Sequence, residues 1–196
     1  MSDDLTREDA WALLCEWTES DSLRKHALGV EAAMRSCARR FGEDEEIYAI
    51  TALVHDLDYE KHPDLDTGHP RVALVELEKL GYPVEVTDAV AGHAPFLGVA
   101  RETTMAKSLF AVDELSGFVG AVALIRPTGI EGLSIKSVRK KLRQPSFAAK
   151  VDRAQVAQGI EELGLEEAEV IQLVIGALAG EAEPLGLSAA QVGAER

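Results

Sequence analysis

The chain has 196 residues, a length that suits one compact domain with, at most, a small appended subdomain. Its hydrophobic content of 46% is ample for a core and excludes general disorder. A formal net charge of −14 disfavours attraction to duplex nucleic acid or to anionic membranes, and an aromatic content of 5% leaves little for base stacking.

The N-terminal sequence and the cysteines indicate the compartment. Residues 1–4 are acidic and lack the basic-then-apolar layout of a signal peptide, and no apolar run approaches the ~20 residues of a membrane helix. Cys15 and Cys37 stand far apart in helix-like stretches, which is typical of reduced, buried thiols. We therefore expect a soluble, cytoplasmic protein.

Helical periodicity runs through nearly the whole chain, and no stretch shows sustained strand alternation. Gly42, Gly81 with Pro83, and Gly164 supply the breaks between helices. The spacing of apolar residues predicts helices over residues 7–19, 22–40, 45–56, 69–80, 84–92, 103–124, 152–163 and 165–179. The expected fold class is all-α, a helical bundle.

The charge pattern divides the C-terminal third. Residues 134–153 contain seven basic side chains against one acid, and residues 161–183 contain seven glutamates and no base. We expect a core over residues 1–130, a helical extension over 131–184 that packs on it, and a loosely held tail over 185–196. Along residues 103–124, small side chains such as Ser116 and Gly120 indicate either close helix packing or room for a ligand.

A series of metal-ligand residue types recurs at helix ends and on apolar helices, and four of the five histidines of the chain join it. His55 and Asp56 end an apolar run, where charge is costly without a strong partner. Imidazoles and carboxylates projecting inward from several helices can hold divalent metal ions. The series runs His26, His55, Asp56, His69, His93, Asp113.

The order and context of these residues resemble the HD superfamily of all-α, metal-dependent phosphohydrolases. The resemblance covers about residues 21–120, and the blocks over residues 103–126 and 137–164 are similar to a little-characterised bacterial branch. His26 lies early on a helix, His55-Asp56 follows an apolar helix, and His69-Pro70 begins the next. His93 follows the fifth helix, and Asp113 stands in a segment similar to the family's last motif.

Three substrate assignments do not carry over from that resemblance. Leu57-Asp58-Tyr59 departs from the common continuation of the HD pair. His93-Ala94 lacks the double histidine of the cyclic-di-GMP phosphodiesterases, and the carboxylate pair of the alarmone hydrolases is only half present. The substrate therefore stays open.

The resemblance implies a site for two divalent metal ions, because family members with the larger ligand set usually bind two. Asp56 is the implied bridging ligand. Four imidazoles with two carboxylates favour Fe, Mn, Co, Ni or Zn over Mg. The chemistry implied is polarisation of a phosphoryl oxygen and activation of a water molecule.

Other charged residues are candidates for catalysis and substrate binding. Besides Asp56, we expect Asp58, Glu60 and Lys61 to border the metals and to act in catalysis, although a solvated loop would explain the last three equally. A helix would align Lys136, Arg139, Lys140 and Arg143 on one side. That side either clamps substrate phosphates or pairs with the acidic C-terminal residues.

Three classes of function remain open at this point. The first is a phosphohydrolase acting on a small phosphate ester or nucleotide, such as a dinucleoside polyphosphate. The second is a di-iron oxygenase that cleaves a C–C or C–P bond with the same ligand set. The third is a non-catalytic metal or nucleotide sensor. The sequence also leaves the oligomeric state open.

Overall fold

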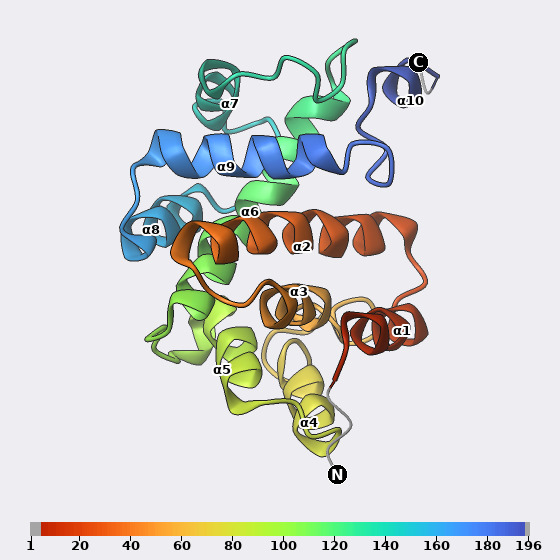
Figure 1. Cartoon of the computed structure of the whole chain (residues 1–196), viewed down its shortest axis with the longest axis vertical. Helices are drawn as coiled ribbons and strands as arrows, with labels where there is room; N and C mark the ends of the chain where they lie inside the picture. Colours follow the sequence, from red (N-terminus) through yellow and green to blue (C-terminus); the bar gives the residue numbers. More distant parts are fainter. Residues whose placement is uncertain (1–4, 195–196) are drawn as a thin grey trace.

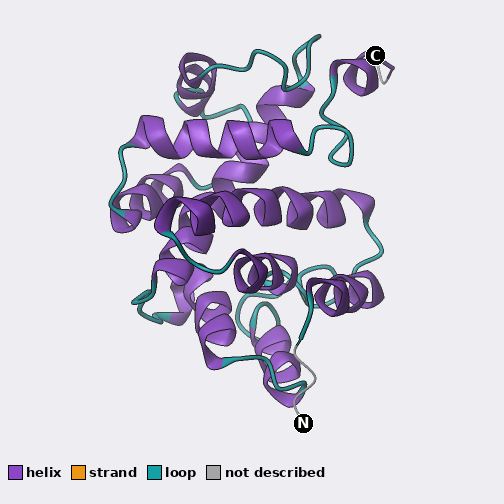
Figure 2. Cartoon of the chain, in the orientation of Figure 1, coloured by secondary structure: helices purple, strands orange, loops and turns teal. Residues whose placement is uncertain are grey.

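The computed structural model describes residues 5–194, and over that range all regular structure is helical (Figure 2). The expected all-α fold is confirmed. None of the described helices is long and apolar enough to cross a membrane. In chain order the helices are α1 (Arg7–Trp17), α2 (Asp21–Phe41), α3 (Glu45–Val54), α4 (Arg71–Lys79), α5 (Val84–His93), the 3-10 turn η1 (Pro95–Leu97), α6 (Thr104–Leu124), α7 (Ile135–Leu142), α8 (Arg153–Leu163), α9 (Glu167–Gly180) and α10 (Ala189–Ala194).

Side-chain caps set where several helices begin. The Thr6 hydroxyl accepts a hydrogen bond from the Asp9 backbone N–H, and Asp9 bonds back to Thr6, forming a capping box. Gly42 and Gly164 end α2 and α8 in the left-handed conformation. The structure differs from the prediction around residue 54, because α3 ends there and residues 55–61 form turns. His55 and Asp56 therefore occupy a turn that enters the interior.

Helix α6 passes through the middle of the molecule and is buried on nearly all sides, as Leu109, Phe110 and Phe118 show. Helices α2 and α9 lie side by side, and α6 crosses behind both (Figure 1). Helix α8 crosses α6 at Gly159, where an added Cβ would lie 2.7 Å from Ala111 Cα. The backbones of α6 and α8 thus approach as closely as a glycine permits.

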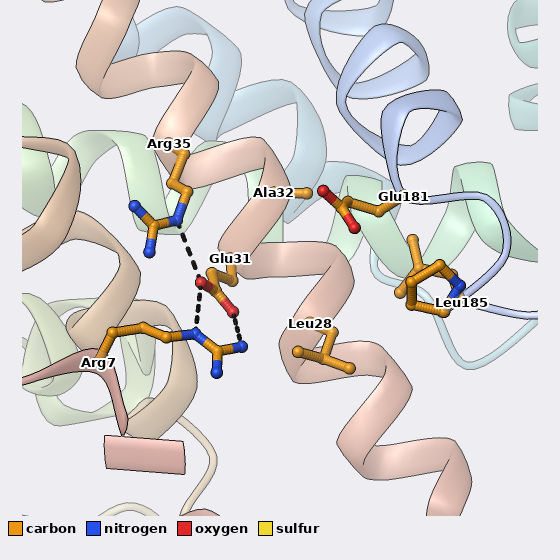
Figure 3. A pocket seen from close by; sticks show the side chains of 8 residues that line it. Arg7, Leu28, Glu31, Ala32, Arg35, Glu181 and Leu185 are labelled. Atoms are coloured by element: carbon orange, nitrogen blue, oxygen red, sulfur yellow. Dashed lines mark hydrogen bonds and ion pairs between the residues drawn. The ribbon is translucent and has the colours of Figure 1, made fainter. Parts of the chain in front are cut away.

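A charged cluster joins α1 to α2. The carboxylate of Glu31 is 7% exposed and accepts hydrogen bonds from the Arg7 guanidinium at 3.0 and 2.8 Å and from Arg35 at 3.1 Å (Figure 3). Two guanidinium groups therefore satisfy one buried carboxylate. The cluster fixes α1 against α2, and the end of α1 in turn contacts the loop that follows His55 and Asp56.

The C-terminal segment differs from the expectation of a loosely held tail. Leu185, Leu187 and Val192 are buried, and Ile130 donates a backbone hydrogen bond of 2.9 Å to the Leu187 carbonyl. This carbonyl also lies close to Gly129, where a Cβ would collide with it. The structure therefore contradicts the tail assignment for residues 185–194, because spaced apolar residues anchor this segment. The division of the chain near residue 130 stays a prediction.

Candidate metal centre

Five helices bring the six expected ligands together. His26 lies on α2 and Asp113 on α6, while His93 is the last residue of α5. The other three lie next to helix ends: His55 and Asp56 directly follow α3, and His69 stands two residues before α4. The run from Ala49 to Val54 is fully or almost fully buried, so the chain that leaves α3 delivers His55 to the interior with 0% exposure.

One half of the site joins His26 and His55 to two carboxylates. The Nε2 atom of His26 lies 3.0 Å from Asp113 Oδ1 and 3.8 Å from Asp56 Oδ2. The Nε2 atom of His55 lies 3.4 Å from the same Asp113 oxygen and 3.5 Å from the same Asp56 oxygen. These four side chains surround one point.

The other half joins His69 and His93 to the second oxygen of Asp56. Their Nε2 atoms lie 3.5 and 3.4 Å from Asp56 Oδ1. Asp56 is therefore shared: Oδ2 faces the His26–His55 half and Oδ1 faces the His69–His93 half. Two groups of three residues, each with two histidines and Asp56, have all their ligand atoms within 4.8 Å of one another. They are His26–His55–Asp56 and Asp56–His69–His93.

Hydrogen bonds on the far side of three imidazoles aim their Nε2 atoms at the centre. The Nδ1 atom of His55 lies 2.6 Å from the Ala52 carbonyl, and that of His93 contacts the Val90 carbonyl. The Nδ1 atom of His69 lies 2.8 Å from the Asp58 carboxylate. Because each acceptor requires a proton on Nδ1, the neutral form of each imidazole carries its lone pair on Nε2, where it can bind a metal ion.

Burial and charge oppose each other at this centre. Burial disfavours protonated His55, but the carboxylates of Asp56 and Asp113 outweigh burial and raise its pKa to about 10. Burial also acts against ionised Asp56 and Asp113, yet the nearby imidazoles hold both pKa values below the usual range. The carboxylates therefore require positive charge beside them.

The residues present suit divalent metal ions. Within the described part of the chain, the buried His55 Nε2 makes no hydrogen bond, although two carboxylate oxygens lie 3.4 and 3.5 Å away. A cation between these atoms would satisfy the imidazole and both carboxylates together. The imidazoles and carboxylates could hold a divalent metal ion. The expected preference for Fe, Mn, Co, Ni or Zn stays a prediction.

Asp58 is close to the centre but faces away from it. Its carboxylate is 0% exposed and accepts hydrogen bonds of 2.8 Å from His69 Nδ1 and from the Ala73 backbone N–H. A group that is saturated and sealed in this way has no contact with a substrate. The structure therefore places Asp58 behind His69, where its carboxylate can orient the imidazole. The proton-transfer role expected for Asp58 stays a prediction.

Glu60 and Lys61 are engaged elsewhere. The Glu60 carboxylate accepts hydrogen bonds from the Glu19 and Ser20 backbone N–H groups, at 2.6 and 3.1 Å. The Lys61 ammonium donates to the Glu16 carbonyl at 3.0 Å. Glu60 thus ties its loop to the α1–α2 connection, and Lys61 ties it to the end of α1. The structure does not bring either side chain to the metal centre, and their catalytic roles stay a prediction. His62, the one histidine outside the expected ligand series, is exposed.

The basic residues expected to bind substrate lie on and just after α7, which packs on α9 and α6. Arg139 pairs with Glu167 of α9 at 2.6 Å. The lining of the metal cleft includes none of Lys136, Arg139, Lys140 and Arg143. Arg139 therefore follows the alternative prediction, pairing with the acidic C-terminal helices. The structure does not bring these four residues to the metal cleft, and their role in substrate binding stays a prediction.

An open cleft of about 540 Å³ leads to the metal centre. His26, Asp56, His69, His93 and Asp113 form its floor, and the partly exposed Tyr59, Leu65 and Phe96 stand along it. Two acidic residues, Glu114 and Asp152, also line the cleft. Among the residues that the structure describes, no lysine or arginine lines this cleft.

Sequence analysis missed several of these lining residues. Glu114 directly follows Asp113, and burial together with the Asp113 charge raises its pKa to about 7. The position of Glu114 next to Asp113 in the sequence could have identified it as a residue of the site. Asp152 and Gln155 lie at the start of α8, and no local pattern connects them with the ligands. Met105 and Phe110 are buried in the core.

The fold and the site define an all-helical protein with a His/Asp centre suited to divalent metals. Residues 23–117 match the family model of the HD domain, and this segment contains all six ligands. This match over residues 23–117 is consistent with membership in the HD-domain superfamily and confirms the resemblance seen in the motifs. Among curated proteins and solved structures, none matches the chain.

Proposed function

We propose that the protein is a metal-dependent phosphohydrolase that acts on a small phosphate ester and uses two divalent metal ions. The observation that carries this proposal is the division of the ligands into two groups that share Asp56. His26, His55 and Asp113 would hold one ion, and His69 with His93 the other. Such ions supply polarisation of a phosphoryl oxygen and a water molecule acidified to near-neutral pKa.

The protein's own side chains would position the substrate. The floor of the cleft offers the ligands, while Tyr59, Leu65 and Phe96 can contact an apolar or aromatic group of the ester. Asp58 would keep His69 in the tautomer that leaves Nε2 unprotonated.

The charge of the cleft favours an ester with few phosphates. Glu114 and Asp152 lie along it, and within the described residues no basic side chain lines it. A polyphosphate brings several negative charges and would be repelled where the metal ions do not neutralise them. This lining therefore favours a phosphomonoester over a dinucleoside polyphosphate.

The same observation supports an alternative, a di-iron oxygenase acting on a substrate of low charge. The ligand set is equally suited to two iron ions. Iron loading without oxygen, followed by an oxygen-uptake assay on the same esters and on phosphonates, separates the two activities. Oxygen consumption that depends on substrate would favour the oxygenase.

The direct test combines metal content with phosphate release. Protein purified without chelators should contain two transition-metal ions per chain and release phosphate from phosphomonoesters. Asp56→Ala should lose both properties, because Asp56 belongs to both ligand groups. His62→Ala is the matched control, since His62 is exposed and lies outside the site. Full metal content and turnover in Asp56→Ala would refute the proposal.

A further inference from the structure

A second groove adjoins the metal cleft on the other side of His26. It has a volume of about 360 Å³ and runs between the first turns of α2 and the second half of α6. Both hollows share His26 and Gly117. Gly117 is exposed although it lies within a central helix, so the two hollows meet over a position without a side chain.

The groove has one polar side, while its α6 side and far end are small or apolar. On the α2 side lie Asp21, Ser22 and Lys25, and the Lys25 ammonium pairs with the Asp21 carboxylate at 2.7 Å. Gly117, Gly120 and Ala121 form its α6 side. Its far end is closed by Leu178 of α9 and by Leu185 and Leu187 of the packed C-terminal segment. An added Cβ at Gly120 would meet nothing within 4 Å, so helix packing does not explain this glycine.

Two hydrogen-bonding groups at the groove have no protein partner. Ser116 lines it and is 3% exposed, and within the described chain its hydroxyl has no hydrogen-bond partner. The covered hydroxyl gains no stability from this position, because a buried polar group without a partner is costly.

His26 supplies the second group. Three of the four imidazoles in the metal centre donate Nδ1–H to a protein acceptor. The Nδ1 atom of His26 has none among the residues that the structure describes, and it lies 3.7 Å from where a Cβ of Gly117 would be. It is thus placed where the groove and the cleft meet. A metal-bound histidine usually donates this proton to an acceptor.

We infer that the groove binds the non-reacting part of the substrate, a short apolar chain or ring that carries a hydrogen-bond acceptor near His26 and Ser116. The substrate is then a small amphiphile with its phosphate head in the metal cleft. This assignment rests on the proposed function for the head group, while binding in the groove can be measured without turnover.

The test uses two phosphonates, which resist phosphoester hydrolysis, with the protein carrying its own metals. By calorimetry without oxygen, octylphosphonate should bind at least tenfold more tightly than ethylphosphonate. Gly120→Leu should remove this difference, because the new side chain fills the groove, and it should leave metal content and ethylphosphonate affinity unchanged. Ala121→Leu is a second filling variant, and Gly176→Leu, on an open surface of α9, is the control.

The acceptor is tested with an ether-containing alkylphosphonate of the same length. This compound should bind the wild type at least as tightly as octylphosphonate and should lose at least threefold in Ser116→Ala. Equal affinities for octyl- and ethylphosphonate, no binding of either, or filling variants that keep the octyl preference would overturn the inference. An octyl preference in a protein that hydrolyses no ester would refute the proposed reaction and leave the groove assignment standing.

Discussion

Asp58→Asn is the most informative single substitution, because it changes one atom outside the ligand set. The wild-type carboxylate accepts from both His69 Nδ1 and the Ala73 N–H, each at 2.8 Å. An asparagine has only one oxygen for these two donors. If that oxygen keeps the Ala73 bond, the amide NH2 faces His69 and requires Nδ1 to accept. The proton then moves to Nε2, the atom that should bind metal.

The expected magnitude follows from this change of tautomer. Loss of a partner behind a metal-bound histidine typically weakens metal binding by roughly 10- to 100-fold. This corresponds to about 1.4–2.7 kcal/mol at one of the two ions. The buried charge-assisted hydrogen bond is lost as well, so the free energy of unfolding should fall by roughly 1.5–3 kcal/mol. The Nε2 atom of His69 lies next to Asp56 Oδ1, the oxygen that faces away from the His26–His55 half of the site. Binding of the ion held by His26, His55 and Asp113 should therefore be unchanged.

Metal titration of the apoprotein, with elemental analysis after dialysis, measures this effect. Wild-type protein should bind two ions tightly, and Asp58→Asn one tightly and one weakly. Asp66→Asn, the same chemical change at an exposed position of the following loop, should behave as the wild type. Two tight ions in Asp58→Asn would refute the positioning role of Asp58.

Three further predictions concern the site and the packing around it. His69→Ala and His93→Ala should each lower the metal content from two ions towards one without unfolding the chain; two ions retained in both would show that these histidines do not bind metal. Arg139→Ala should leave the KM for a phosphomonoester unchanged and lower the melting temperature slightly, because its partner is on α9; a tenfold rise in KM would restore its substrate role. Gly159→Ala should lower the free energy of unfolding by roughly 1–3 kcal/mol, because the added methyl group overpacks the α6–α8 crossing. Gly176→Ala, with open space around it, should raise the free energy of unfolding by up to about 1 kcal/mol. Equal effects of the two substitutions would mean that the crossing is not tight.

The candidate ligands could be predicted from sequence because histidine is rare in this chain and because these residues stand in apolar, helical surroundings. Only five histidines are present, and those in the centre stand at helix ends or on apolar helices, where an uncompensated charge is costly. The helix pattern also predicts that such ends converge in a bundle. What the sequence could not give was the division into two groups, because that depends on which oxygen of Asp56 faces which imidazole.

The residues after the HD pair show why proximity along the chain is a weak guide. Asp58, Glu60 and Lys61 follow the ligands directly, yet they turn towards α4, the α1–α2 loop and the end of α1 respectively. Each of these partners is 15 or more residues away in sequence. Only the turns over residues 55–61 decide these directions, and turns carry little periodic signal.

The basic helix α7 has the largest consequence for function. Its spacing predicts a charged face, but not the neighbour opposite, which is set by packing on α9 and the pairing of Arg139 with Glu167. Arg139 is paired with Glu167, and the lining of the metal cleft includes none of Lys136, Lys140 and Arg143, so its charged walls are the acidic side chains of Glu114 and Asp152. Affinity for a substrate must then come from the metal ions and from apolar contacts, since the cleft offers little other attraction for an anion. The groove beyond His26 supplies apolar surface next to the candidate ligands. An acidic cleft beside an apolar groove favours a substrate with little negative charge and an apolar group.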